Sequence, residues 1–168
     1  GRKIIVIGDH GHDEVIAIAD KAPSTIVIST PEEANKLKKI KKAGIVSQST
    51  QAMENVQEII SILMTKIFDL RFVNTICYPT KRNQEQIKDL AIIVDVMIII
   101  GSFTSANSKR LTSLSYKINK KTYQVADESD VDKDWFTNCS SVGISAGAST
   151  PDYLITNIKK RIESIGKK

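Results

Sequence analysis

The chain has 168 residues, of which 41% are hydrophobic and 26% are charged, a balance typical of a soluble globular protein with one domain or two small ones. No apolar run approaches the length of a membrane span, and the apolar start at Ile4 is too short for a signal peptide and soon meets Asp9. We therefore expect neither a membrane anchor nor a secretory leader. Two cysteines, Cys77 and Cys139, are too few for a disulfide framework and favour a reducing compartment.

The formal net charge is +5, and much of the excess lies in lysines at 36–42 and in a basic run at 159–161. Lysines near the ends of helices face solvent and interact favourably with the helix C-terminus. A nucleic-acid surface would combine basic residues with aromatic ones, and aromatic residues make up only 5% of this chain. We therefore expect no nucleic-acid partner.

The first half of the sequence alternates between strand and helix patterns. An apolar run at residues 3–8 ends in glycine, which predicts a strand buried on both faces, and a polar loop at 9–14 follows it. The next predicted elements are a helix over 13–22, a strand over 24–29, a helix from Pro31 to about Lys39, a short strand over 44–47 and a helix over 53–67.

The second half repeats this order. It predicts a strand over 72–76, a helix over 84–94, a glycine-ended strand over 96–101, a helix over 105–118 and a strand over 122–125. An acidic stretch at 127–134 leads to a short helix near Trp135, before a strand over 142–146 and a helix over 151–165. We predict two small, similar parallel-sheet α/β domains, residues 1–72 and 73–168, of which the first looks N-terminally truncated.

Three polar loops follow predicted strands and precede predicted helices. Because open α/β sheets bind ligands beyond the carboxyl ends of their strands, these loops predict a phosphate or diphosphate site made of neutral donors. Neither a P-loop nor a dinucleotide-binding glycine motif occurs. The donors are Ser47, Gln48, Ser49 and Thr50 in the first loop, Ser102, Thr104, Ser105, Asn107 and Ser108 in the second, and Ser145, Ser149 and Thr150 in the third.

Cys77 and the His10–Glu14 loop leave several chemical roles open. Cys77 follows a predicted strand and is either a small buried residue, a metal or cluster ligand, or a nucleophile. His10, His12 and Glu14 share one loop, where they could hold zinc, cap a helix, or contact an anion and transfer a proton.

Five motifs in order resemble the 4-hydroxy-3-methylbut-2-enyl diphosphate reductase (LytB) family over essentially the whole chain. They are GHDEV at 11–15, VSQST at 46–50, ICYPT at 76–80 with Gln84, GSFTSANSKRL at 101–111 and VGISAGASTP at 142–151. The resemblance implies a three-domain α/β fold around a [4Fe-4S] cluster held by three cysteines. It also implies reductive removal of a hydroxyl from an allylic diphosphate, the last step of the methylerythritol phosphate route to isoprenoids.

The resemblance assigns roles to individual residues. It makes Cys77 a cluster ligand, and Glu14 and Ser49 the catalytic proton relay, with Ser49 standing where the family usually has threonine. It makes His12, Thr50, Ser105, Asn107 and Ser149 substrate-binding residues. Ala106 replaces a serine that usually contributes a contact, Asp13 replaces a common proline, and the pair Arg82 and Asn83 departs from the family pattern.

The family's first domain and its other two cysteines have no counterpart in the sequence. We therefore expect the second and third domains of a reductase, without cluster or activity on their own and with diphosphate affinity no better than about the high micromolar range. The full-length enzyme would use a ferredoxin- or flavodoxin-type electron donor in the cytoplasm, or in a plastid. The alternatives are a non-catalytic diphosphate-binding module that has lost the cluster, and one half of a complex whose other chain supplies the missing cysteines.

Overall fold

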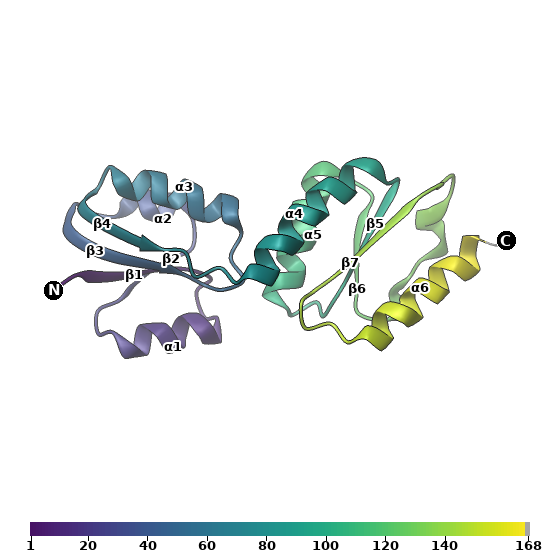
Figure 1. Ribbon diagram of the computed structural model, residues 1–168, viewed down its shortest axis with the longest axis horizontal. Helices are drawn as coiled ribbons and strands as arrows, with labels where there is room; N and C mark the ends of the chain where they lie inside the picture. Colours follow the sequence, from purple (N-terminus) through teal and green to yellow (C-terminus); the bar gives the residue numbers. More distant parts are fainter. Residues whose placement is uncertain (167–168) are drawn as a thin grey trace. The chain divides into compact units, whose positions relative to one another are not determined.

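The computed structural model describes residues 1–166, which divide into two compact α/β units, residues 1–78 and 79–166 (Figure 1). Both units contain one parallel sheet flanked by helices, as the alternation of patterns predicts. Within the described residues, no helix has the combination of length and apolar character that crossing a membrane requires.

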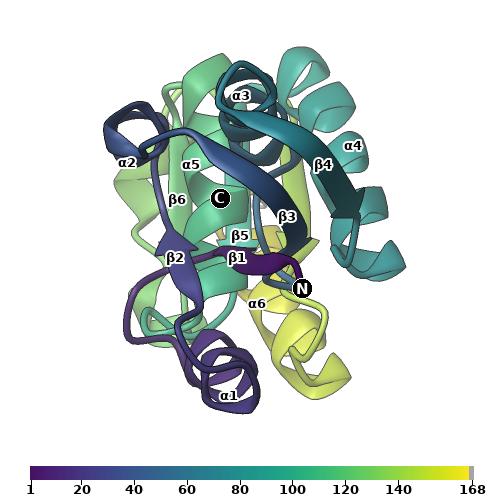
Figure 2. The same ribbon diagram turned by 90° about the vertical axis from the view of Figure 1, so that its left-hand side faces the viewer.

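The first unit has a four-stranded sheet in the order β2-β1-β3-β4, in which all pairs are parallel (Figure 2). Its central strand β1 aligns Ile5 with Ile26 on one side and with Ile45 on the other. The elements are β1 (Lys3–Ile7), α1 (Asp13–Lys21), β2 (Ile26–Ile28), α2 (Pro31–Lys36), β3 (Ile40–Ser47), α3 (Met53–Met64) and β4 (Ile67–Val73).

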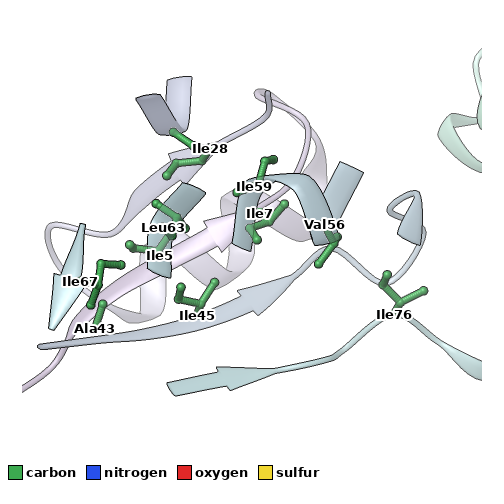
Figure 3. Close-up of a cluster of buried hydrophobic side chains, with 11 residues drawn as sticks. Ile5, Ile7, Ile28, Ala43, Ile45, Val56, Ile59, Leu63, Ile67 and Ile76 are labelled. Carbon is green, nitrogen blue, oxygen red and sulfur yellow. The ribbon is translucent and has the colours of Figure 1, made fainter. Parts of the chain in front are cut away.

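The core of the first unit lies between the sheet and helices α2 and α3. Ile5, Ile7 and Ile45 point to this face and pack in one cluster with Ile59 and Leu63 of α3 (Figure 3). Val6 points to the opposite face, which α1 covers (Figure 2). Each of these fully buried side chains contributes about 1.5–3 kcal/mol through removal from water, so the sheet is held rigidly beneath the loops at its edge.

The second unit has a three-stranded parallel sheet in the order β6-β5-β7. Every residue of β5 is buried, and its side chains alternate: Met97 and Ile99 pack against α4 and α5, whereas Ile98 packs on the side of α6. The elements are α4 (Tyr78–Ile93), β5 (Val96–Ile100), α5 (Ala106–Ile118), β6 (Thr122–Val125), the short 3-10 helices η1 (Glu128–Asp130) and η2 (Lys133–Phe136), β7 (Val142–Ala146) and α6 (Asp152–Gly166).

One predicted strand was assigned to the wrong domain. The prediction of a strand over 72–76 that opens the second domain is wrong, because β4 begins at Ile67 and pairs with β3 from Ile40 to Val46. The helix predicted to reach Ile67 ends at Met64. Phe72, Val73 and Cys77 therefore belong to the first unit, and the division falls after Tyr78 rather than after residue 72.

Other differences concern the ends of elements. β3 starts four residues earlier than the predicted strand over 44–47, and α2 ends at Lys36 rather than near Lys39. The helix predicted over 84–94 begins at Tyr78, with Pro79 in its first turn, where proline is tolerated. The strands predicted over 122–125 and 142–146 are confirmed.

Candidate functional site

In the first unit, the loops that follow β1 and β3 are joined by the side chain of Gln48. Its amide oxygen accepts a hydrogen bond from the Asp9 N–H at 2.8 Å, and its amide nitrogen donates to Thr50 Oγ1 at 3.0 Å. Gln48 is fully buried, so both bonds form away from water. The sequence predicted Gln48 as one of the neutral donors of a phosphate site; in the structure its buried side chain instead joins the two loops.

Glu14 and Ser49 are in direct contact. Glu14 lies in the first turn of α1, and its two carboxylate oxygens accept hydrogen bonds from Ser49 N and Ser49 Oγ, each at 2.8 Å. Both residues are half-buried. The two predicted catalytic residues are thus hydrogen-bonded to each other, hydroxyl to carboxylate.

His12 caps the helix that carries Glu14. Its Nδ1 accepts a hydrogen bond from Glu14 N at 3.2 Å, so in the neutral ring the proton resides on Nε2, which can donate to an anion. Gly11 precedes it with φ at +77°, a conformation that favours glycine. Capping was one of the roles that the sequence left open, and here the cap also fixes the orientation of the imidazole.

Cys77 is held beside the same loops by its backbone. Cys77 N donates to Ser49 O at 2.9 Å, and the preceding residue, Ile76, is buried in the core of the first unit (Figure 3). Thr75 continues the pairing of β3 and β4 with its side chain, because Oγ1 accepts from Ser47 N at 2.8 Å and donates to Ser47 O. His12, Glu14, Ser49, Thr50 and Cys77 therefore share one edge of the first sheet.

In the second unit, glycines let the loops after β5 and β7 approach α5 closely. A Cβ on Gly101 would lie 2.1 Å from Ser108 Oγ, and a Cβ on Gly147 would lie 2.8 Å from the same atom. Gly147 N and Thr150 Oγ1 both donate to Ile100 O, at 3.0 and 3.1 Å. These contacts seat the two loops on the N-terminal end of α5.

The predicted diphosphate-binding residues of the second unit lie around this helix end. Ser105 is the N-cap of α5, and its Oγ accepts from Ser108 N at 3.3 Å. Asn107 is 8% exposed, and its buried Oδ1 has no hydrogen-bond partner within the described chain. Ser149 is exposed in the loop after β7. A buried amide oxygen without a protein partner, in the first turn of a helix, is suited to contact with a polar ligand.

The described residues do not by themselves provide a complete metal site. Residues 1–166 contain no group of three or more His, Cys, Asp or Glu side chains placed to hold a metal ion. His10 contacts Glu33 and His12 caps α1, so the alternative of zinc held by His10, His12 and Glu14 has no support. An iron–sulfur cluster needs several thiolates, and Cys77 offers one. Cys139 packs against the core of the second unit and its Sγ donates to Ser141 O at 3.3 Å.

Comparison with known proteins identifies the family. The family model described as LytB protein matches residues 1–163. The 4-hydroxy-3-methylbut-2-enyl diphosphate reductases of Geotalea daltonii and Geobacter sulfurreducens are 40% and 38% identical, over 99% and 100% of this chain. Each is matched over 60% of its own length, so the chain spans about three-fifths of these relatives.

Solved structures agree with this result. The structure of the E-1-hydroxy-2-methyl-but-2-enyl-4-diphosphate reductase from Plasmodium falciparum is 27% identical and superposes with a TM-score of 0.88, covering 97% of this chain and 52% of that one. A structure of (E)-4-hydroxy-3-methyl-but-2-enyl diphosphate reductase, titled the terminal enzyme of the non-mevalonate pathway, is 37% identical with a TM-score of 0.55. The match covers 98% of this chain and 60% of the chain in that structure. The chain therefore belongs to the LytB protein family.

Proposed function

We propose that these 168 residues are part of a 4-hydroxy-3-methylbut-2-enyl diphosphate reductase in the methylerythritol phosphate pathway. The reaction breaks the allylic C–O bond, releases the hydroxyl as water, and consumes two electrons and two protons to give isopentenyl and dimethylallyl diphosphate. A ferredoxin- or flavodoxin-type protein would supply the electrons, and the enzyme would work in the cytoplasm or in a plastid. The observation that carries the proposal is the Glu14–Ser49 contact beside Cys77, in a chain of this family.

In this proposal the first unit handles the proton and one part of the diphosphate. The Glu14 carboxyl group provides a proton and the Ser49 hydroxyl passes it on, because the two groups are already within hydrogen-bond distance. Serine replaces the family's usual threonine and keeps the hydroxyl. His12 would donate from Nε2 to a diphosphate oxygen, and Thr50 would add a neutral donor.

The second unit would bind diphosphate through Ser105, Asn107 and Ser149. The buried Oδ1 of Asn107, which has no partner in the described chain, supports this role, since rotation of the amide by 180° places the NH2 group there, where it can donate to an anion without a change in shape. Hydrogen bonds to charged groups contribute about 1.5–3 kcal/mol each. Two or three of them give about 3–9 kcal/mol, which is similar to an association cost of about 4 kcal/mol or more, so we expect weak binding by this chain alone.

Cys77 would provide one thiolate of a [4Fe-4S] cluster, and the cluster, when bound in the whole enzyme, would supply electrons to the substrate. The remaining protein ligands would lie in the part of the relatives that this chain does not span. We therefore expect the isolated chain to be inactive and to form no stable cluster. Anaerobic reconstitution with iron and sulfide tests this directly, because stoichiometric cluster absorption from residues 1–168 alone would contradict the assignment.

A chimaera tests the activity. Residues 1–168 would replace the matching 60% of the Geotalea daltonii reductase, and substrate consumption would be followed with a chemical electron donor. We expect activity, its loss in Glu14→Gln and Cys77→Ser, and weaker substrate binding with unchanged cluster content in Ser149→Ala. Glu32→Gln is the matched control for Glu14→Gln, since Glu32 lies on α2, where the side chain contacts Thr30.

The second candidate is a diphosphate-binding module without redox chemistry, which is favoured by the single thiol at the sheet edge. The chimaera separates the two functions. If it binds a cluster through Cys77 but turns over no substrate, while the chain binds pyrophosphate, the reductase proposal fails and the binding module remains.

A further inference from the structure

The loop between β1 and α1 has a second external support besides Gln48. His10 Nε2 lies 3.0 Å from both carboxylate oxygens of Glu33, a residue of α2 that is 23 positions away in the sequence. None of the histidine roles considered from the sequence, which were zinc binding, helix capping, and anion contact with proton transfer, requires this partner. The contact joins the loop to the helix that follows β2.

Glu33 is itself well anchored. Its Oε2 accepts a hydrogen bond from Ser29 N at 2.7 Å, and its own N–H donates to the N-cap residue Thr30 at 3.4 Å. The Ser29 N–H and then the His10 contact hold the pKa of the Glu33 carboxyl below its usual range, so the group is ionised at neutral pH. A carboxylate fixed by the end of β2 is a firm support for a neighbouring loop.

The loop in question sets the position of His12. Asp9 N is bound to Gln48 Oε1 at 2.8 Å, His12 N donates to Asp9 O at 3.2 Å, and Gly11 between them has positive φ. Between these two anchors, the side chain of His10 contacts another element, the helix α2 that carries Glu33. The cap on α1 sets the orientation of the His12 ring, and the contact of His10 with Glu33 helps to hold the loop backbone that leads into His12.

We propose that Glu33 is a positioning residue that acts through His10 to hold the 9–12 loop, and with it His12, in the geometry that receives a diphosphate. The effect on ligand binding rests on the proposed function, whereas the effect on the loop does not. The pair is partly exposed, with 58% of the His10 side chain and 36% of the Glu33 side chain accessible, so its effect is modest. Exposed pairs of this kind correspond to about a two- to five-fold change in an equilibrium constant.

Amide hydrogen exchange measures the effect without a ligand. We expect Glu33→Gln and His10→Ala each to accelerate exchange of the Asp9 and His12 N–H groups about two- to five-fold, and the double variant to add nothing further. Glu32→Gln, one residue away on the same helix, is the control and leaves both rates unchanged. If Glu33 only supported the start of α2, Glu33→Gln would affect Ser29 and α2 but not the loop, and His10→Ala would have no effect. That outcome would overturn the inference.

Titration with inorganic pyrophosphate, followed by the NMR signals of His12, measures the consequence for binding. We expect both single variants to weaken binding about two- to five-fold, in proportion to the exchange result, with Glu32→Gln unchanged. Variants with faster loop exchange but unaltered pyrophosphate affinity would also refute the positioning role. If the unmodified chain shows no pyrophosphate response at His12, the proposed diphosphate contact fails, and the exchange experiment alone decides whether Glu33 holds the loop.

Discussion

Replacement of Gly101 by alanine tests how closely the loops of the second unit approach α5. The new Cβ would lie 2.1 Å from Ser108 Oγ and 2.9 Å from Ser108 Cβ, and Ser108 is 2% exposed. Because the obstacle includes the first atom of a helical side chain, rotation of the serine hydroxyl does not relieve it. Overpacking of this severity costs about 3 kcal/mol, near the upper end of the usual range.

Gly147→Ala is the graded comparison. Its Cβ would lie 2.8 Å from Ser108 Oγ and 3.3 Å from Thr150 Oγ1, contacts with the ends of side chains that can move by a few tenths of an ångström. We expect a loss of about 1 kcal/mol. The companion change Ser108→Ala removes the Oγ atom that both new Cβ atoms would meet. Combined with Gly147→Ala, it should therefore restore most of the lost stability. Combined with Gly101→Ala, it should restore only part, because the 2.9 Å contact with the Cβ of residue 108 remains.

The fluorescence of Trp135 is the assay, because this residue is the only tryptophan of the sequence and stacks on Tyr123 in the second unit, with ring centroids 4.0 Å apart. A loss of 3 kcal/mol lowers the melting temperature of a domain of about 90 residues by about 12–24 °C, and a loss of 1 kcal/mol lowers it by about 4–8 °C. Gly166→Ala is the control, since nothing lies within 4 Å of its Cβ position. Equal melting temperatures for Gly101→Ala and Gly166→Ala would refute the close-approach argument.

Three further changes probe the described contacts. Glu14→Ala removes the acceptor for both Ser49 donors and should lower the free energy of urea unfolding by about 1–2 kcal/mol. Glu14→Gln can still bond to Ser49 and should lower it by less than about 1 kcal/mol. Equal losses for the two variants would contradict the two-bond geometry. Thr75→Val leaves the buried backbone of Ser47 without its partner and should cost about 2 kcal/mol, whereas Thr75→Ser should be near neutral. Hydrogen bonds from the N–H groups of Ser140 and Ser141 hold the pKa of Asp95 below its usual 3.8. The ionised carboxylate therefore stabilises the fold fully above about pH 5, and this stabilisation is lost as the pH falls through the lowered pKa. Asp95→Asn should reduce the dependence on pH, between about 5 and 2, of the unfolding free energy measured by Trp135 fluorescence.

The sequence predicted a strand well where a continuous apolar run is followed directly by a glycine. β1 and β5 are apolar runs that end in glycine, and both are central strands of their sheets. The start of β4 was missed because Ile67 continues the apolar stripe of α3 and no glycine or proline marks the helix end. The stop comes instead from Thr65, whose N–H bonds back to Ile62 O and Leu63 O, a feature that the residue types do not announce.

The site residues were predictable from motifs, but their supports were not. Gln48 bonds to Asp9 across 39 residues, and Glu33 contacts His10 across 23. Such pairs depend on the sheet order, which places β3 beside β1 and β2 on the other side of β1. A sequence pattern that fixes strand and helix periods does not contain this order, and therefore does not show which polar side chains meet.

The two units use one backbone design for different chemistry. In both, a glycine ends the strand and the N-cap follows four positions later: Gly8 and His12 in the first unit, Gly101 and Ser105 in the second. The third helical residue then packs where the glycine lacks a side chain, since a Cβ on Gly8 would lie 2.5 Å from Val15 Cγ2, much as one on Gly101 would meet Ser108 Oγ at 2.1 Å.

The equivalence extends to the polar groups. His12 and Ser105 both cap their helices. Two residues after the cap, the first unit has Glu14 and the second has Asn107, so a carboxyl group in one unit occupies the position of a neutral amide in the other. In each unit the glycine brings the strand end close to the helix start, and the residues at the cap and at the second helical position differ in the chemistry that they offer to a ligand. One repeated local design thus presents a carboxylate hydrogen-bonded to Ser49 in the first unit and a buried amide oxygen without a hydrogen-bond partner in the second.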